Sequence, residues 1–565
     1  MSRTTLSERG DAPAADGGQD GGGPDDGGSG PRRALPPVAL VLTAGSGALL
    51  SVGAFLGLYV RPTSDDWCAL WKARDLGVLG ITGDFYLTQN GRVTNAFLTG
   101  LLYSDGMLGP SLLPAFLVVT LGVGLYLLGR AALRALRLPF PRVAALTATL
   151  VVEALLFFAG TRPYQALLWA PATVSHTLPS VVGVWAVLSA VVAARSRRRW
   201  ARSAAVGAAV LLGAAIGMLS EPFVAMSGLI AVAVGVLCLP RFGRTRDRFV
   251  PTWCAAWCLG LLIGLVLLST SPGARWRRAQ RPGAPLSLAE VRETLGDWYR
   301  IWETVGGQWA YAGALAAGVL LGLAVAFAAP CPSPDRKGPA PDRPDRKGPS
   351  QNRKDTPPGR KDASPAREGT PPNRWREPEG PRSPSPDGPP SRGTFLAAVA
   401  LPVPLIAVGS LVAAYGLRGG YGPGGWTYAR TWTSFLVPFL LALCGYGAWL
   451  GHRIGRRLGR APTTGGARAA GLTVLVVTGA VAVASLTALV LPVRTLTTKT
   501  VARSIAWDRQ DVRIRSEAAA GRREVTYRPL LIGGLAEPFF TEVYADDWAA
   551  HCAAAYYGVE RLVRP

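Results

Sequence analysis

Long apolar runs alternate along this chain with short hydrophilic loops. Each run is close to the ~20 residues that an α-helix needs to cross ~30 Å of hydrocarbon. The pattern therefore predicts an all-α integral membrane protein with about eleven transmembrane helices. The runs cover residues 35–60, 107–129, 143–160, 178–194, 203–219, 222–240, 249–269, 308–329, 394–417, 433–451 and 470–492.

The loops that follow the even-numbered runs are rich in arginine. Residues 130–142, 195–202, 241–248 and 452–469 carry 4, 5, 4 and 5 arginines, and Asp247 is the only acid among them. Cytoplasmic loops of membrane proteins carry an excess of Lys and Arg. We therefore expect a multi-pass protein of the cell membrane with a cytoplasmic N-terminus and an extracytoplasmic C-terminus.

Two segments lack the apolar content that a folded core requires. Residues 1–33 are rich in Gly and Asp, and we expect a disordered cytoplasmic N-terminus. Residues 330–393 are rich in Pro and Arg, and we expect a disordered cytoplasmic linker. This linker divides the membrane domain into residues 34–329, with eight runs, and 394–492, with three. Attraction of its net basic charge to the anionic inner leaflet is the alternative to a plain linker.

The first outer segment, residues 61–106, has apolar residues at helical spacing. Trp67 and Trp71 mark one amphipathic helix, and Phe97 and Leu101 mark a second. We expect these helices to lie on the membrane surface, with aromatic side chains anchored at headgroup level. A second outer segment covers residues 270–307.

The C-terminal segment, residues 493–565, is expected to form a small α/β extracytoplasmic cap on the outer mouth of the bundle. Its pattern predicts a helix near 497–518, a strand near 524–532 and a last helix near 546–557. Gly558 would end that last helix, because glycine readily adopts the left-handed conformation found after helix C-termini.

Composition narrows the class of function. Hydrophobic residues make up 49% of the chain and charged residues 17%, which argues against a soluble enzyme. The net charge is +24, but the arginines lie in short loops between apolar runs, which excludes a nucleic-acid partner. The first apolar run is too long for a cleavable signal peptide, so we expect a signal anchor. Abundant Ala, Arg, Gly and Pro with few Lys are typical of GC-rich genomes, such as those of actinobacteria.

Ionisable side chains are scarce inside the apolar runs, and Glu153 is the main exception. Transporters and proton pumps place such groups near the bilayer midplane. In this chain the polar candidates gather on the outer side instead. They are Asp65, Asp66, Asn90, Arg92, Asp105, Arg162, Tyr164, His176, Glu221, Arg275 and Arg430.

Asp65 and Asp66 directly follow the first apolar run, in RPTSDDWC. A carboxylate at the membrane–water boundary can accept a proton from a hydroxyl nucleophile. One aspartate could act as the base, and the other could bind a hydroxyl or a divalent metal. The alternative is that Ser64, Asp65 or Asp66 only caps the following helix.

Two further motifs place arginine on the outer side. In QNGR, Asn-Gly marks a tight turn that presents Arg92. In TSPGARWRR, a Pro-Gly turn precedes a basic cluster that contains Arg275 and Arg277. Arginine can hold a phosphate with two hydrogen bonds. The alternatives are ordinary lipid headgroups for Arg92, and a long loop whose charge has no topological constraint for the cluster.

His176 lies in RPYQALLWAPATVSHTLPS, near Arg162, and is the only outer-side histidine before the C-terminal segment. It could donate a hydrogen bond to a substrate, or it could be a satisfied histidine of the interface. The chain has no HExxH, paired CxxC, EF-hand loop or P-loop. No cofactor is therefore assigned, and a divalent metal at the aspartate pair stays open.

Two of the seven cysteines, Cys68 and Cys552, are the only ones on the outer side. Two thiols in an oxidising compartment can pair. We predict a disulfide that ties the helix after Asp66 to the C-terminal cap. Two separately buried thiols are the alternative.

The motifs DDWCALW, QNGR and SPGAR and the terminal stretch WAAHCAAAYYGVERL share one side and keep this order. Together they resemble a family of uncharacterised bacterial polytopic membrane proteins that is similar to the GT-C glycosyltransferases. The resemblance covers most of the chain outside residues 1–33 and 331–393. GT-C enzymes pass a sugar from a polyprenyl-phosphate donor to an acceptor outside the cytoplasm, usually with inversion. They bear an acidic residue just after the first span, where Asp65 and Asp66 stand in this chain.

The resemblance implies a GT-C-like membrane glycosyltransferase of the cell envelope. Asp65 or Asp66 would deprotonate the acceptor hydroxyl. Arg92 and Arg275 would bind the donor phosphate, and Glu221 would orient the sugar or the acceptor. The partners would be a polyprenyl-phosphate-linked sugar, membrane lipids and an extracytoplasmic acceptor. The other substrate-binding candidates are Asn90, Arg162, His176 and Arg430.

Acceptor recognition stays open, because the cap of about 73 residues is too short for a large carbohydrate-binding module. Two other classes of protein also fit the pattern. A transporter or flippase for an envelope lipid or polymer needs a continuous polar route past the midplane, involving Glu153. A non-catalytic envelope assembly protein would use Asp65 and Asp66 for caps or ion pairs. The transferase needs one of these aspartates in an outer cavity, with arginine nearby and a lateral opening to lipid.

Overall fold

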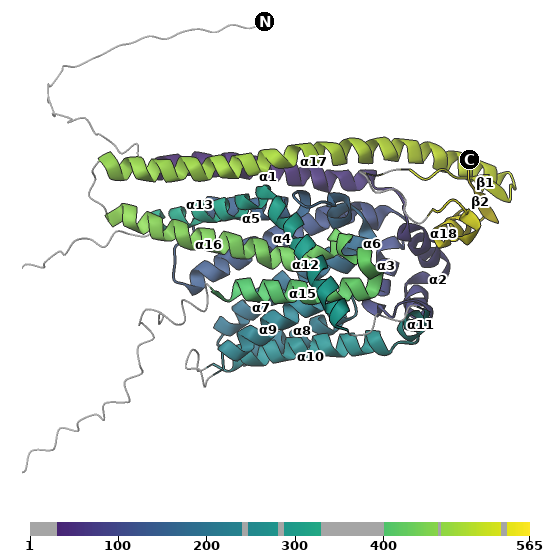
Figure 1. Cartoon of the computed structure of the whole chain (residues 1–565), viewed down its shortest axis with the longest axis horizontal. Coiled ribbons are helices and arrows are strands. Elements are labelled where there is room, and N and C mark those ends of the chain that lie inside the picture. The colour runs from purple at the N-terminus through teal and green to yellow at the C-terminus, as the bar shows by residue number, and fades with distance from the viewer. Residues whose placement is uncertain are drawn as a thin grey trace, which may run out of the picture.

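The structure is a computed structural model that describes residues 31–239, 247–280, 287–328, 400–460, 465–530, 532 and 540–565. The described part is mostly helical and contains one small sheet (Figure 1). Nearly all of the predicted disordered N-terminus and the whole of the predicted linker lie outside the described residues.

Nine of the described helices are long and apolar enough to cross a membrane, which indicates a membrane protein. They lie side by side along the long axis of the molecule (Figure 1). They are built on α1 (Pro31–Phe55), α4 (Leu108–Ala135), α7 (Leu178–Arg195), α8 (Arg199–Gly217), α10 (Phe249–Thr270), α13 (Ala312–Ala328), α15 (Pro402–Tyr421), α16 (Thr433–Arg460) and α17 (Gly465–Ala519).

Two further predicted spans coincide with shorter helices. These are α5 (Arg142–Phe158) and α9 (Glu221–Leu237), each with 17 residues. Both pack inside the same bundle, α5 against α1 and α13, and α9 against α10 and α15.

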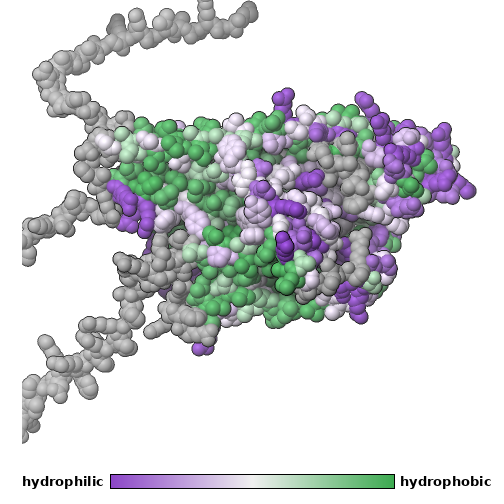
Figure 2. Space-filling model, in the orientation of Figure 1, coloured by the Kyte–Doolittle hydropathy of each residue, from purple (hydrophilic) through white to green (hydrophobic). Residues whose placement is uncertain are grey.

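Helix packing produces two apolar cores. The larger core joins α1, α4, α5, α13, α16 and α17, and the smaller one joins α7, α8, α9 and α10. Close approach in the smaller core depends on small residues: Gly213 and Gly217 of α8 face Gly260 and Gly264 of α10. Such small-residue stripes let helix backbones meet in membranes. Figure 2 shows hydrophobic side chains along the flank of the bundle and hydrophilic side chains at the end that carries the C-terminal segment.

That end of the molecule gathers helices from the predicted outer segments (Figure 1). Residues 61–106 form α2 (Asp65–Thr88), which is kinked at Gly77, and α3 (Val93–Tyr103). Residues 270–307 form α11 (Pro272–Gln280) and α12 (Leu288–Gly307). Single turns complete the chain: η1 (Leu56–Tyr59), η2 (Tyr164–Leu168), α6 (Ala170–Ala172), η3 (Thr173–Thr177), η5 (Trp309–Tyr311), η6 (Gly422–Thr427), η7 (Ala429–Trp432) and η8 (Tyr544–Asp546).

The C-terminal segment begins as a continuation of α17, which runs unbroken through 55 residues to Ala519. The sequence predicts separate helices before and after Pro492 instead. Strand β1 (Glu524–Thr526) pairs in parallel with β2 (Arg561–Val563). Between them lies α18 (Trp548–Tyr557), which ends at Gly558 with φ of 70°, as expected.

One predicted surface anchor is wrong. Trp67 does not reach a headgroup region, because its side chain is fully buried among aromatic rings of the C-terminal segment. Its ring centroid lies 6.2 Å from that of Trp507, 5.9 Å from that of Tyr527 and 5.5 Å from that of Tyr556. This aromatic cluster joins α2 to α17 and α18.

Candidate functional site

A cavity of about 710 Å³ lies at the end of the bundle formed by α2, α3, α11 and α18, and we call it the polar cavity. Ligand sites in proteins commonly have volumes of about 300–1,000 Å³. The polar cavity brings together five residues that the sequence analysis selected. They are Asp65, Asn90, Arg92, His176 and Arg430.

The two aspartates have different surroundings. Asp66 is buried beneath the cavity, where its carboxylate accepts a hydrogen bond from the backbone N–H of Thr63 at 2.9 Å and another from the hydroxyl of Tyr103. Asp65 lines the cavity, and its carboxylate makes no hydrogen bond within the described residues. Asp66 thus closes the turn before α2, whereas Asp65 is available to a ligand.

Burial affects the protonation of both carboxyls. It raises the pKa of Asp65, although the positive charges of Arg430 and Arg277 act in the opposite direction. It raises the pKa of Asp66 to about 7, against the hydrogen bonds from Tyr103 and Thr63. A carboxylate that faces a cavity and has a raised pKa suits a general base, because its pKa lies closer to the pH at which the protein works.

The turn before Asp65 is held by the extension of α17. Arg503 is 5% exposed, and its guanidinium donates to the carbonyl oxygens of Pro62 at 2.7 Å and Arg61 at 3.2 Å. Arg61 in turn donates to the carboxylate of Asp508 at 2.6 Å. Arg503 was missed in the sequence analysis, because nothing in its local pattern indicates a partner more than 400 positions away.

The motifs QNGR and SPGAR dock on each other. Gly91 has φ of 73°, and a Cβ there would overlap the hydroxyl of Ser271 and lie 2.8 Å from the carbonyl oxygen of Leu268. A Cβ on Gly273 would lie 2.7 Å from the backbone nitrogen of Gln89. The two glycines therefore permit a backbone contact that places the N-terminal turn of α11 at the edge of the cavity.

Arg92 is oriented from two sides. Its backbone N–H donates to the side-chain oxygen of Asn90 at 3.0 Å, so Asn90 shapes the turn. Its guanidinium donates to the carboxylate of Glu221, at the start of α9, at 2.7 Å. The charge of Glu221 raises the pKa of Arg92. The pair brings two predicted site residues together, and it fixes the direction of the Arg92 guanidinium.

Two other arginines in the cavity have no carboxylate partner within the described residues. Arg430 of η7 stacks against Trp169, with its guanidinium carbon 5.2 Å from the ring centroid, and against Tyr428 at 4.8 Å. Arg277 of α11 is exposed at the edge of the cavity. Aromatic stacking fixes a guanidinium while leaving its N–H groups available to an anion.

His176 lies in η3, one of two π-helical turns that flank Trp169. Its side chain is 5% exposed, and Nδ1 makes no hydrogen bond to any residue that the structure describes. Its backbone carbonyl accepts from the hydroxyl of Thr433 at 2.9 Å, which fixes the turn. Single π turns often occur at functional sites. The expectation of a satisfied interfacial histidine does not hold for Nδ1.

A second cavity, of about 520 Å³, adjoins the first and shares five lining residues with it, and we call it the apolar groove. It runs between α9, α10 and α15, with walls that include Val224, Leu265 and Val412. Its polar end is shared with the polar cavity. The shared residues are Asn90, Arg92, His176, Arg277 and Tyr421. The polar cavity thus meets the apolar groove at these five side chains, which are cationic or can form hydrogen bonds.

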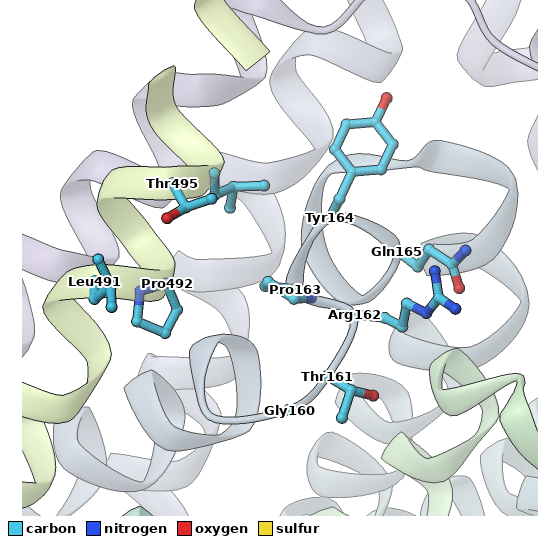
Figure 3. A pocket seen from close by; sticks show the side chains of 10 residues that line it. Gly160, Thr161, Arg162, Pro163, Tyr164, Gln165, Leu491, Pro492 and Thr495 are labelled. Carbon is cyan, nitrogen blue, oxygen red and sulfur yellow. The ribbon is translucent and has the colours of Figure 1, made fainter. Parts of the chain in front are cut away.

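Two predicted site residues lie elsewhere. Arg275 is exposed on α11 and donates to the carbonyl of Thr270 at 2.9 Å, and Arg277, two positions later, lines the cavity instead. Arg162 lines a separate pocket of about 360 Å³ between residues 160–165 and α17. In Figure 3 its side chain extends away from α17, so this pocket is faced mainly by backbone and apolar groups.

Cys68 and Cys552 form a disulfide between α2 and α18, the pairing that the sequence predicts. Both cysteines line the polar cavity, together with Trp548 and His551 of α18. The C-terminal segment therefore contributes directly to the site, which the sequence analysis did not anticipate. The alignment of Trp548 and Cys552 on one helix face was the available signal.

No group of three or more His, Cys, Asp and Glu side chains with the arrangement of a metal site occurs among the described residues. Comparison with protein-family models, with curated proteins and with solved structures gives no match for this chain. The chemistry of the site is therefore argued from its geometry.

Proposed function

We propose that this protein is a membrane glycosyltransferase that moves a sugar from a polyprenyl-phosphate donor to an extracytoplasmic acceptor of the cell envelope. One observation carries the proposal: Asp65 faces a cavity that also holds Arg277 and Arg430, where that cavity meets an apolar groove. A base, an anion site and a route for an apolar chain then lie in one continuous space.

The junction of the two cavities fits the phosphate of a lipid-linked donor. Arg277, Arg92 and His176 line it, and the groove between α9, α10 and α15 can receive an isoprenoid chain from the side. The sugar would then lie in the polar cavity, near Asp65 and Arg430. An anionic headgroup with an apolar tail is the chemistry that this pair of chambers complements.

The reaction would be a single displacement with inversion. The acceptor oxygen forms a bond to the anomeric carbon while the bond from that carbon to the phosphate oxygen breaks. Asp65 accepts the proton of the acceptor hydroxyl. The departing polyprenyl phosphate gains negative charge, which the guanidinium groups of Arg92 and Arg277 stabilise.

For the whole chain we propose the eleven-span arrangement, with α5 and α9 as the two short spans. The arginine-rich loops would face the cytoplasm, together with the N-terminus. The polar cavity and the C-terminal segment, as a small cap, would face outward. This placement is supported by the common position of α2, α3, α11 and α18 at one end of the bundle (Figure 1).

The alternatives are less well supported. A transporter or flippase needs polar groups past the midplane. The carboxylate oxygens of Glu153 in α5 have no hydrogen-bond partner in the part of the chain that the structure describes, and Glu153 lines neither the polar cavity nor the apolar groove. A non-catalytic assembly protein would use both aspartates for structure. Asp66 has a structural role, because it accepts a hydrogen bond from the backbone of Thr63, whereas Asp65 faces the polar cavity.

The test is transfer of radiolabelled sugar by the purified protein, with a panel of polyprenyl-phosphate sugars and a membrane extract as the acceptor pool. We expect Asp65→Asn to lower transfer by about 10²-fold or more, as for the loss of a general base. Arg277→Gln should raise the donor KM more than it lowers kcat.

Asp105→Asn is the matched control, because Asp105 is an exposed aspartate of the same outer segment outside the cavity. It should retain the wild-type rate. Transfer that survives Asp65→Asn would show that the base is another group. If the wild type consumes no donor of the panel, the transferase proposal fails.

A further inference from the structure

Part of the polar cavity lies away from its junction with the apolar groove, and α2 and α18 form the wall there. Trp71 of α2 and Trp548 of α18 line this wall, with the disulfide of Cys68 and Cys552. None of these four residues lines the apolar groove. We call these four residues the tryptophan wall.

Helix geometry places both indoles next to the disulfide. Trp71 follows Cys68 by three positions in α2, and Trp548 precedes Cys552 by four positions in α18. Residues at these spacings share one face of a helix. The disulfide brings the two faces together, with the Cα atoms of the cysteines 4.8 Å apart. Two indoles therefore flank one covalent link, and both line the cavity.

The wall is held rigidly from behind. Trp67, on α2, packs against Trp507 of α17 and against Tyr556 and Tyr557 of α18. Ala550, Ala553 and Ala554 of α18 are buried in the same cluster. A binding surface that is rigid before the ligand arrives loses little conformational entropy when it binds.

The lysine next to the wall is ion-paired. The ammonium group of Lys72 lies 2.5 Å from the carboxylate of Asp84, which also accepts from the side-chain amide of Gln89 at 3.0 Å. Deeper in the cavity the lining is hydroxyl and amide groups, where Asn95 donates to the hydroxyl of Ser175 at 2.8 Å. The four residues of the wall carry no charge themselves, and hydrogen-bonding groups lie at its edge.

We propose that the tryptophan wall binds a neutral glycan. The C–H faces of pyranose rings pack on indoles, and their hydroxyl rims pair with amide and hydroxyl groups. An acyl chain would need a continuous apolar lining, which the groove has and this wall lacks. The glycan's role as acceptor in the transfer reaction rests on the function proposed above, whereas its binding does not.

The test uses the full-length protein in lipid nanodiscs, without any donor. Isothermal titration with maltotetraose, cellotetraose, α-1,6-mannotetraose and chitotetraose measures binding, and tetragalacturonate and an uncharged octapeptide are the competing classes. We expect a neutral tetrasaccharide to bind, and Trp71→Ala and Trp548→Ala each to weaken its binding by about tenfold. Trp548→Phe should give an intermediate affinity, and Trp200→Ala, at an exposed indole of α8, should change nothing.

The inference is overturned if no tetrasaccharide binds, if binding survives both alanine variants, or if the octapeptide or tetragalacturonate binds more tightly. Its failure differs from that of the proposed function. If the protein binds a glycan through its indoles but consumes no donor, the glycan-site proposal stands and the transferase proposal fails. If the protein transfers sugar to a lipid or a peptide but binds no glycan, the transferase proposal stands and the glycan-site proposal fails.

Discussion

Consecutive residues of an α-helix point roughly 100° apart. The first turn of α2 therefore gives its two carboxylates different environments. Asp65 faces the polar cavity, and Asp66 turns inward to Thr63 and Tyr103. Asp66 makes the structural contacts that a helix start requires, so that the neighbouring Asp65 can remain available for chemistry.

Asp66 should make stability depend on pH. Its pKa is about 7 in the folded protein, against ~3.9 for an unperturbed aspartate. The folded state thus holds the proton more tightly, and stability is lost as pH rises from about 4 through 7. Between pH 5 and pH 8 the loss is on the order of 3 kcal/mol. The melting temperature of the wild type should fall over this range.

Asp66→Asn imitates the protonated carboxyl and should remove this dependence. Its melting temperature should fall less than that of the wild type between pH 5 and pH 8, because, of the two aspartates, only Asp65 then has a raised pKa, and at pH 8 it should match or exceed that of the wild type. Thermal unfolding of both proteins across the pH series measures the difference. A wild-type melting temperature that rises with pH would contradict the assigned surroundings of Asp66.

At this scale the sequence identifies candidates but not their orientation. The outer-side position predicted for Asp65, Asp66 and Arg92 is based on the apolar pattern alone. The choice between Asp65 and Asp66 depends on where α2 begins and what packs beneath it. Similarly, the rotation of α11 decides that Arg277 rather than Arg275 lines the cavity.

Among the elements, the turn at residues 89–92 and the start of α11 act as one unit. Gly91 and Gly273 let their backbones touch, and this contact sets the place of Arg92 and Arg277 at the junction of the two cavities. The geometry of the proposed phosphate site thus depends on two residues that carry no functional group.

Gly91→Ala should therefore destabilise the protein by roughly 2–4 kcal/mol, because its φ is positive and its Cβ would overlap Ser271. The matched control is Gly83→Ala in α2, where a Cβ meets nothing within 4 Å. That change should stabilise the helix by up to about 1 kcal/mol. Thermal unfolding compares the two variants, and equal melting temperatures would show that the close contact is absent.

The sequence predicts helices correctly where a local pattern determines them, and it fails where packing against distant segments determines where a helix ends. The apolar runs coincide with helices, and Gly558 ends α18 as its position predicts. The break expected near Pro492 does not occur, because α17 packs along α1 and α13 and continues past the proline. The missing N–H of one proline is outweighed by contacts on both sides of it.

The molecule as a whole has one chemically distinctive end. The polar cavity, the disulfide and the small sheet all lie there (Figure 1). Among the described residues, the opposite helix ends carry arginines of the short loops, such as Arg134, Arg197 and Arg456. Asymmetry of this kind orients a polytopic protein during insertion, because basic loops remain on the cytoplasmic side.

Membrane orientation can be tested with single added cysteines. Asp105 and Arg197 are both exposed, the first in the turn after α3 and the second in the loop after α7. In intact cells we expect a membrane-impermeant maleimide to label Asp105→Cys. Arg197→Cys should react only after permeabilisation, and protein without added cysteine is the control. Labelling of Arg197→Cys alone in intact cells would reverse the proposed orientation.

The disulfide also has a consequence for biosynthesis. Its two cysteines are 484 positions apart, and the second lies near the C-terminus. At about 5–20 residues per second, the thiol of Cys68 must wait roughly 25–100 s for its partner to be synthesised. A chain that terminates early cannot close this bond and retains a reactive thiol beside Asp66. The oxidised pair is therefore a covalent mark of a chain that has been synthesised past Cys552, and a non-reducing gel can detect it directly.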